Sequence, residues 1–195
     1  LCSVVGTAIF IERLLCFRRA SRQERAVRSA SGLIAVGRYE EALAFLQEKR
    51  GADTPAGRIL LEAVEARTVD RETLEMILGH GVEREVKHLG RYLDTLATLA
   101  SIAPLLGLLG TVLGLIKAFI VVEQTGGRVN ASLLAGGIWE AMLTTAMGLT
   151  VAIPLIMFFN HLEGRLADLQ AGLGDLAVSQ LRAWRENDGK ERRDR

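Results

Sequence analysis

Two long stretches of this chain are almost free of charged residues. None lies between Asp94 and Lys117, and only Glu140 lies between Arg128 and Glu163. A bilayer core requires about 20 predominantly apolar residues per helical span, and both stretches are longer than that. We therefore predict two membrane-spanning helices, over residues 89–121 and 131–161, joined by a short loop at 122–130.

A third apolar stretch covers residues 1–17 and contains Glu12 and Arg13. It is short for a complete span, so we interpret it as the C-terminal part of a first transmembrane helix whose beginning precedes the sequence given. The alternative is a cleaved signal peptide. That alternative fits less well, because the charges lie at the wrong end and no small-residue cleavage site follows.

Basic residues near the ends of membrane spans indicate the cytoplasmic side. They follow the first stretch, precede the second and follow the third, whereas the 122–130 loop carries only Arg128. We therefore expect residues 18–88 and the C-terminal tail in the cytoplasm, and the loop and N-terminus on the opposite side. The residues are Arg18, Arg19, Arg22, Arg25, Arg28, Lys87, Arg91, Arg165, Arg182 and Arg185.

The cytoplasmic segment 18–88 has the pattern of amphipathic helices. Leu43 and Leu46 share one face of a predicted helix at 39–49, and Pro55 follows a break and can open the next helix. Another helical pattern begins near Asp70. It is expected to continue through Leu89 into the second span as one long helix.

The third span is expected to continue as an amphipathic cytoplasmic extension over 162–185, followed by a disordered tail at 186–195. Leucines recur there at spacings of three and four, which predicts packing on the cytoplasmic helices. The fold class expected is an all-α membrane protein with three transmembrane helices, a cytoplasmic helical bundle and a homo-oligomeric assembly. The leucines are Leu162, Leu166, Leu169, Leu173 and Leu176.

Charge and composition exclude several functions. The net charge is +1, which gives no footprint for nucleic acid; the basic clusters fit topology and anionic lipid better. Cys2 and Cys16 lie about 21 Å apart on one helix, so they cannot pair and are interpreted as small apolar residues. The histidines have no metal-ligand spacing and no nucleophile motif occurs, so we expect no enzyme, metal or cofactor.

Small residues recur along one face of each complete span. In lipid such residues let helix backbones approach closely, so we expect these strips to face an axis shared by several copies. Gly107, Gly110, Gly114, Gly148 and Thr144 are the candidate pore-lining or close-packing residues. The strips are Ala103, Gly107, Gly110, Gly114 and Ala118 in the second span, and Ala141, Thr144, Thr145, Gly148 and Ala152 in the third.

Glu140 needs an explanation, because an ionised carboxylate in a bilayer costs on the order of 3 kcal/mol. It is either a proton-handling pore residue or a glutamate that reaches the headgroups or pairs with a neighbouring helix; the adjacent Trp139 slightly favours the second. Thr111 and Thr145 are either transport residues or hydroxyls bonded back to their own helix. Pro104 and Pro154 are expected to kink their helices and shape the bundle.

Two stretches resemble the second and third spans of the ExbB/TolQ/MotA proton channel family, in its ExbB/TolQ branch. They are APLLGLLGTVLGLIKAF at 103–119 and GGIWEAMLTTAMGLTVAIPLIMFFN at 136–160. The combination of GTV in one span with E-A-x-x-x-T-A-x-G-L-x-x-A-I-P in the next is highly specific. Ile11-Glu12-Arg13, followed by basic residues, also looks like the end of that family's first span.

The resemblance implies a homopentamer around two copies of an ExbD- or TolR-like protein, whose single spanning helix carries an essential Asp. Proton flow between them would energise a periplasmic machine through a TonB- or TolA-like protein. Thr111, Glu140 and Thr145 match the family's ion pathway. It further implies a bacterial inner membrane location, with the N-terminus and the 122–130 loop periplasmic and the C-terminus cytoplasmic.

Two alternatives stay open: a MotA-type flagellar stator subunit, and an oligomeric membrane scaffold that conducts nothing. The sequence does not distinguish H⁺ from Na⁺, an ExbB from a TolQ role, or one periplasmic machine from another. It also leaves open the role of the segment before residue 1, and whether Thr144 or Thr145 faces the pore.

Overall fold

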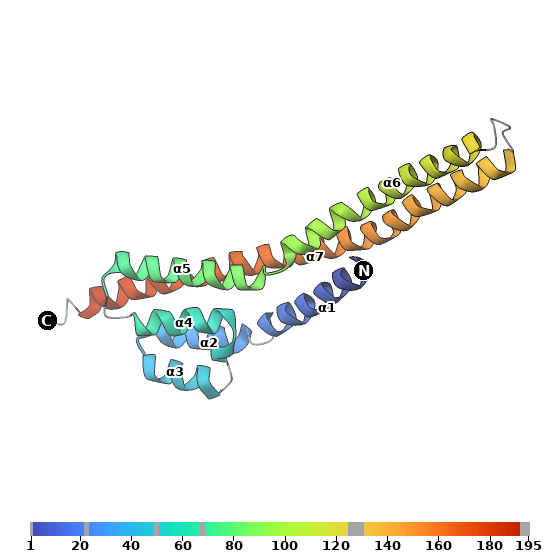
Figure 1. Cartoon of the computed structure of the whole chain (residues 1–195). Helices are drawn as coiled ribbons and strands as arrows, with labels where there is room; N and C mark the ends of the chain where they lie inside the picture. Colours follow the sequence, from blue (N-terminus) through green and yellow to red (C-terminus); the bar gives the residue numbers. More distant parts are fainter. Residues whose placement is uncertain (1, 22–23, 49–50, 67–68, 125–130, 192–195) are drawn as a thin grey trace. The chain divides into compact units, whose positions relative to one another are not determined.

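The computed structural model describes residues 2–21, 24–48, 51–66, 69–124 and 131–191, and these residues form helices joined by short turns (Figure 1). No strand occurs within those ranges, so the all-α prediction is confirmed. The elements are α1 (Cys2–Ser21), α2 (Glu24–Ala35), α3 (Tyr39–Glu48), the 3-10 turn η1 (Gly51–Asp53), α4 (Pro55–Glu65), α5 (Arg71–Leu89), α6 (Leu93–Gln124) and α7 (Ala131–Glu191).

The chain divides into two compact units. Unit 1 contains Leu1–Glu12 and Tyr92–Leu162, and unit 2 contains Arg13–Arg91 and Glu163–Arg195. The helices α1 and α7 each contribute to both units, and the connection between α5 and α6 falls at the boundary.

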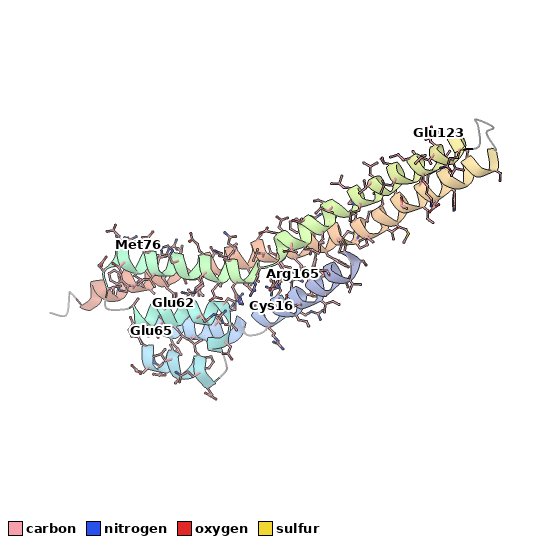
Figure 2. All side chains as sticks on the ribbon, viewed as in Figure 1. Cys16, Glu62, Glu65, Met76, Glu123 and Arg165 are labelled. Atoms are coloured by element: carbon pink, nitrogen blue, oxygen red, sulfur yellow. The ribbon has the colours of Figure 1, made fainter. Side chains whose placement is uncertain are left out.

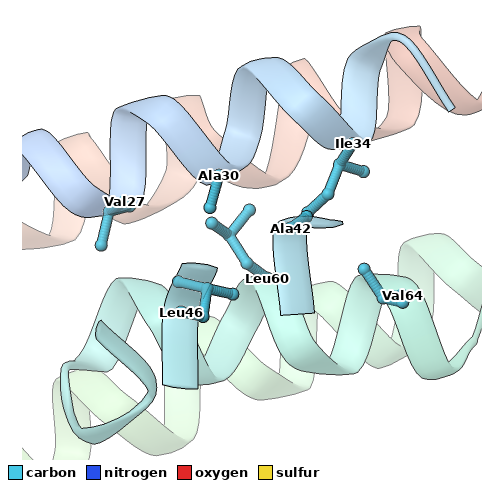
Figure 3. Close-up of a cluster of buried hydrophobic side chains, with 7 residues drawn as sticks. All are labelled: Val27, Ala30, Ile34, Ala42, Leu46, Leu60 and Val64. Atoms are coloured by element: carbon cyan, nitrogen blue, oxygen red, sulfur yellow. The ribbon is translucent and has the colours of Figure 1, made fainter. Parts of the chain in front are cut away.

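Unit 2 has an apolar core where α2, α3 and α4 meet (Figure 3). Leu46 and Leu60 are fully buried in this core, and Leu43 packs against it. The face predicted from Leu43 and Leu46 is therefore confirmed. The buried side chains of the cluster are Val27, Ala30, Ile34, Ala42, Leu46, Leu60 and Val64.

A second apolar cluster joins α4 and α5 to the C-terminal part of α7. Leu74 and Leu78 of α5 are buried in it together with Leu173 of α7, and Leu176 packs against both clusters. The amphipathic pattern after residue 162 predicted this packing, and the prediction is confirmed.

Local signals place the starts of α4 and α5. The Thr54 side chain accepts a hydrogen bond from the Gly57 amide at 3.1 Å, and Pro55 is the first residue of α4. Asp70 caps α5 in the same way, accepting from the Thr73 amide at 3.0 Å. Such caps satisfy amides that have no partner within the helix. The predicted break at 51–55 and the predicted helix start near Asp70 are both confirmed.

The long helix expected from Asp70 into the second span is wrong. The helix α5 ends at Leu89 with Gly90 as its C-cap, and α6 begins at Leu93. Between them Tyr92 has φ +70°, in the left-handed region that residues with a side chain rarely adopt. The apolar spacing gives no sign of this break, because Leu89 and Leu93 lie four residues apart and are both buried.

Two other predicted boundaries shift. The helix α6 continues to Gln124, so part of the predicted 122–130 loop is helical; residues 125–130 lie outside the described ranges. The helix α1 ends at Ser21, and the predicted end of the membrane segment at residue 17 stays a prediction. The helix α7 extends to Glu191, which corrects the disordered tail expected from 186; residues 192–195 lie outside the description. Glu, Lys and Arg are good helix formers, and adding residues to an existing helix is easier than starting one.

In unit 1, α6 lies beside α7 over its length, and the first part of α1 also contacts α7 (Figure 1). The rings of Phe10 and Phe158 stack with centroids 3.9 Å apart, and Gly6 faces the buried Leu155. Pro104 and Pro154 both lie inside helices, and their kinking effect stays a prediction.

Candidate functional site at the contact between α6 and α7

Two helices of the described residues are long and apolar enough to cross a membrane, within Arg71–Gln124 and Leu134–Arg185. Their apolar stretches belong to α6 and α7. Many of the large apolar side chains there are exposed in the single chain, for example Leu105 at 62% and Met157 at 66%. Charged side chains such as Glu123 stand at the end of α6 (Figure 2). Helices whose outer faces are apolar indicate a membrane protein.

The two helices meet through backbone rather than through large side chains. A Cβ built on Gly148 would lie 2.9 Å from both the Ala103 carbonyl oxygen and the Gly107 Cα. A Cβ on Gly107 would lie 3.1 Å from the Thr144 carbonyl oxygen and from the Thr145 Cα. These separations are too short for an ordinary Cβ contact, so the helix backbones touch at this level.

The close approach continues toward the loop between the two helices. A Cβ on Gly114 would lie 2.9 Å from the Ala141 Cβ, and one on Gly110 would lie 2.7 Å from the Thr144 Cβ. Sequence reasoning missed Gly137, where a Cβ would lie 2.6 Å from the Ala118 Cβ. Its position four residues before Ala141 could have placed it on the strip.

The small-residue strips therefore face each other within one chain. This differs from the expectation that they face an axis shared by several copies. The physical reason is that small residues favour close helix contact without specifying the partner. In this structure the nearest partner is the next helix of the same chain.

Thr145 bonds across this contact. Its hydroxyl donates to the Gly107 carbonyl oxygen at 3.0 Å. The Thr144 hydroxyl makes its shorter bond within α7, to the Ala141 oxygen at 2.7 Å, and lies 3.4 Å from the Gly107 oxygen. The structure thus brings both threonines to one carbonyl group of α6, with Thr145 as the closer donor.

Thr111 and Glu140 do not join this group. The Thr111 hydroxyl donates to the Leu108 carbonyl oxygen of its own helix at 2.7 Å. Glu140 is exposed on α7, although Ala141 beside it is buried against α6. At 100° per residue, Glu140 and Thr145 project about 140° apart around the helix axis. Of the three predicted ion-pathway residues, only Thr145 lies at the helix contact.

Comparisons with known proteins identify relatives over most of the chain. Residues 51–173 match the profile of the MotA/TolQ/ExbB proton channel family. The chain is 32% identical over 190 residues to biopolymer transport protein ExbB of Salmonella typhimurium, covering 93% of this chain and 76% of that protein. It is 34% identical over 160 residues to putative biopolymer transport protein ExbB-like 3 of Synechocystis sp., covering 81% and 75% of the two chains.

The chain is also similar to the Tol-Pal system protein TolQ of Haemophilus influenzae, with 36% identity over 94 residues, 48% of this chain and 41% of that protein. The region matched by the family profile contains every residue of the contact between α6 and α7 described above.

Proposed function

This chain belongs to the MotA/TolQ/ExbB proton channel family, and from that premise we propose that it is the channel-forming subunit of an ion-driven motor of the ExbB/TolQ type. In this proposal, copies of the chain surround an ExbD- or TolR-like protein in a bacterial inner membrane. Ion flow through the complex energises a periplasmic machine. The names of the relatives, ExbB and TolQ, favour this branch over a MotA-type stator.

One observation carries the proposal: the Thr145 hydroxyl bonds to a backbone carbonyl of α6 inside a pair of membrane-type helices. In lipid, polar groups that face the hydrocarbon are costly, so hydroxyls gather where helices meet. The same contact places Thr144 within reach of that carbonyl. A polar position surrounded by apolar surface is where an ion could be solvated on its way across.

Glu140 supports an assembly larger than one chain. Its carboxylate is exposed in the single chain, within a helix whose outward neighbours are apolar. Ionisable residues in membrane helices face a bundle interior or a water-filled cavity. A homopentamer with a partner helix inside would provide that environment, and the Asp of the partner would then lie near Glu140 and the threonine positions.

The remaining parts of the proposal concern topology. The first part of α1 contacts α7 within unit 1, through Phe10 and Phe158, which supports α1 as a third membrane helix. Arg18 and Arg19 are exposed in its last turn. The positive-inside rule then places that end, unit 2 and the C-terminus in the cytoplasm and the N-terminus in the periplasm. No covalent chemistry is required of the chain, so we propose no enzymatic activity.

The test is ion flux in liposomes that contain this chain and its ExbD- or TolR-like partner under an imposed pH gradient and membrane potential. We expect flux from the wild type, and loss of most of it in Glu140→Gln and in Thr145→Val. Thr150→Val is the matched control. Thr150 is exposed on α7 and bonds only back to the Ala146 oxygen, at 2.8 Å.

The outcomes separate the alternatives. Flux at the wild-type level in both variants would exclude Glu140 and Thr145 from the ion pathway. Absence of flux from a correctly assembled wild-type complex would favour the scaffold that conducts nothing. Replacing the pH gradient with a sodium gradient decides between H⁺ and Na⁺.

A further inference from the structure

Arg13 is a buried arginine, with 5% of its surface exposed. Its Nη1 donates hydrogen bonds to the carbonyl oxygens of His88 and Leu89, each at 3.2 Å. Both oxygens belong to the last turn of α5, where helix carbonyls have no partner within the helix. A positive donor suits this end of the helix dipole, and its hydrogen bonds are stronger than those of a neutral group. The guanidinium therefore caps α5.

The same two carbonyls would have other donors if the helix continued. In an unbroken α-helix they would accept from the amides of Tyr92 and Leu93. Tyr92 would then adopt right-handed helical dihedrals. Its present φ of +70° is unfavourable for a residue with a Cβ. The apolar spacing allows this alternative, because Leu89, Leu93 and Leu96 are buried at helical intervals on both sides of the break.

We propose that Arg13 is the residue that keeps α5 and α6 separate. By satisfying the His88 and Leu89 oxygens, it removes the hydrogen bonds that would favour one continuous helix, and it offsets the unfavourable backbone of Tyr92. Without the guanidinium, the Leu89 oxygen loses its donor and the His88 oxygen keeps only the long bond from the Arg91 amide, at 3.4 Å. Helix formation through residues 90–93 would supply a donor to each of them. The backbone of residues 90–93 then has two conformations, and Arg13 determines which one is populated. This inference does not depend on the proposed function.

The chain offers a direct measurement, because it contains only two tyrosines, Tyr39 and Tyr92. Tyrosine labelled with ¹⁵N and ¹³Cα gives two signals in solid-state NMR of the full chain in lipid bilayers. The H–N–Cα–H torsion angle reports the sign of φ at each. Tyr39, the first residue of α3, is the internal reference. In the wild type we expect a φ near +70° for Tyr92.

In Arg13→Met we expect the φ of Tyr92 to move to about −63°, and the amides of residues 93–95 to exchange with deuterium more slowly than in the wild type. Methionine has an unbranched apolar side chain of similar length, so the variant retains the packing of the arginine stem but loses the hydrogen-bond donor. In Arg13→Lys the ammonium still donates, and φ is expected to stay positive.

A second variant tests whether the effect depends on the backbone conformation of Tyr92. Glycine adopts a positive φ without penalty, so Arg13→Met combined with Tyr92→Gly is expected to retain the break and to exchange at 93–95 as fast as the wild type. The proposal is overturned if Tyr92 keeps a positive φ in Arg13→Met. It is also overturned if exchange at 93–95 is unchanged or faster in Arg13→Met, or is slowed equally in the double variant.

Discussion

The Thr145 hydroxyl donates a hydrogen bond to the carbonyl oxygen of Gly107, 38 positions earlier in the chain, over 3.0 Å. This bond belongs to the same close contact between α6 and α7 as Gly107 and Gly148, which have no Cβ. The hydroxyl reaches the carbonyl because the helix backbones lie close together. Two predictions about stability follow from this arrangement, and two more concern unit 2.

The two neighbouring threonines should differ when their hydroxyls are removed. Thr145→Val loses the bond to α6, so we expect a loss of roughly 0.6 kcal/mol or more, a typical value for a hydrogen bond between membrane helices. Thr144→Val should cost less, because its shorter bond goes to Ala141 of the same helix, at 2.7 Å. Unfolding in mild detergent measures both. Equal losses would mean that the bond across the contact contributes nothing beyond the local one.

Gly148→Ala should separate α6 from α7. The new methyl group would meet the Ala103 oxygen and the Gly107 Cα at 2.9 Å, and both are backbone atoms that cannot turn away. Overpacking of this kind costs about 1–3 kcal/mol. Gly136→Ala is the control on the same helix, because a Cβ there meets nothing within 4 Å. Thermal unfolding should show destabilisation for the first variant and none for the second.

The Asp70 cap should make unit 2 sensitive to acid. Hydrogen bonds from the Thr73 backbone amide and side chain hold the pKa of Asp70 below its usual range. A pKa that is lower in the folded state gives stability that is present above the unfolded value, about 3.9. That stability is lost as the pH falls through the folded pKa.

Asp70→Asn keeps a capping side chain that does not titrate. We expect the difference in unfolding free energy between the wild type and this variant to be constant near neutral pH. Below about pH 4 the wild type should lose stability relative to the variant. Unfolding measured from pH 3 to 7 tests this. A difference that is independent of pH would show that the Asp70 charge does not contribute.

The Arg58–Glu85 pair between α4 and α5 should respond asymmetrically to substitution. The Arg58 Nε donates to the Glu85 Oε1 at 2.7 Å, and the side chains are 39% and 5% exposed, respectively. This hydrogen bond raises the pKa of Arg58. Arg58→Met would leave a buried, unpaired carboxylate and should cost about 2 kcal/mol, less than for a fully buried pair because Arg58 is partly solvated.

Glu85→Leu should cost much less, because Arg58 can turn to water. The double variant should be close to Glu85→Leu alone, since removing both charges leaves no buried ion. Chemical unfolding of the four proteins gives the coupling energy. If Arg58→Met and Glu85→Leu lower the free energy of unfolding equally, water already solvates the Glu85 carboxylate.

Local features of the sequence predicted local features of the fold. The break before Pro55 and the helical pattern that begins near Asp70 predicted two helix starts, and each start has a cap that reaches only three positions along the chain. The leucine spacing after residue 162 predicted the buried face of α7, because burial on a helix repeats at 3.6 residues whatever the partner is. These predictions required no knowledge of the tertiary structure.

The break between α5 and α6 could not be predicted in this way. Its carbonyls are capped by Arg13, whose bonds to His88 and Leu89 span 75 and 76 positions of sequence. In the sequence, Arg13 looked only like a charge at the end of an apolar stretch. The small-residue strips were likewise found, but their composition did not reveal that they pair with each other within one chain.

The threonine bonds also bear on which ions the contact can favour. Because a carbonyl cannot donate, the hydroxyl hydrogens of Thr144 and Thr145 both point to backbone oxygens. The oxygen of each hydroxyl, the negative end of its dipole, then has unshared electron pairs that can bind an ion. In the proposed ion pathway, such a lining would attract a hydronium or a metal cation and repel chloride. Charge selectivity would follow from the backbone geometry of α6 and α7, before any acidic side chain is involved.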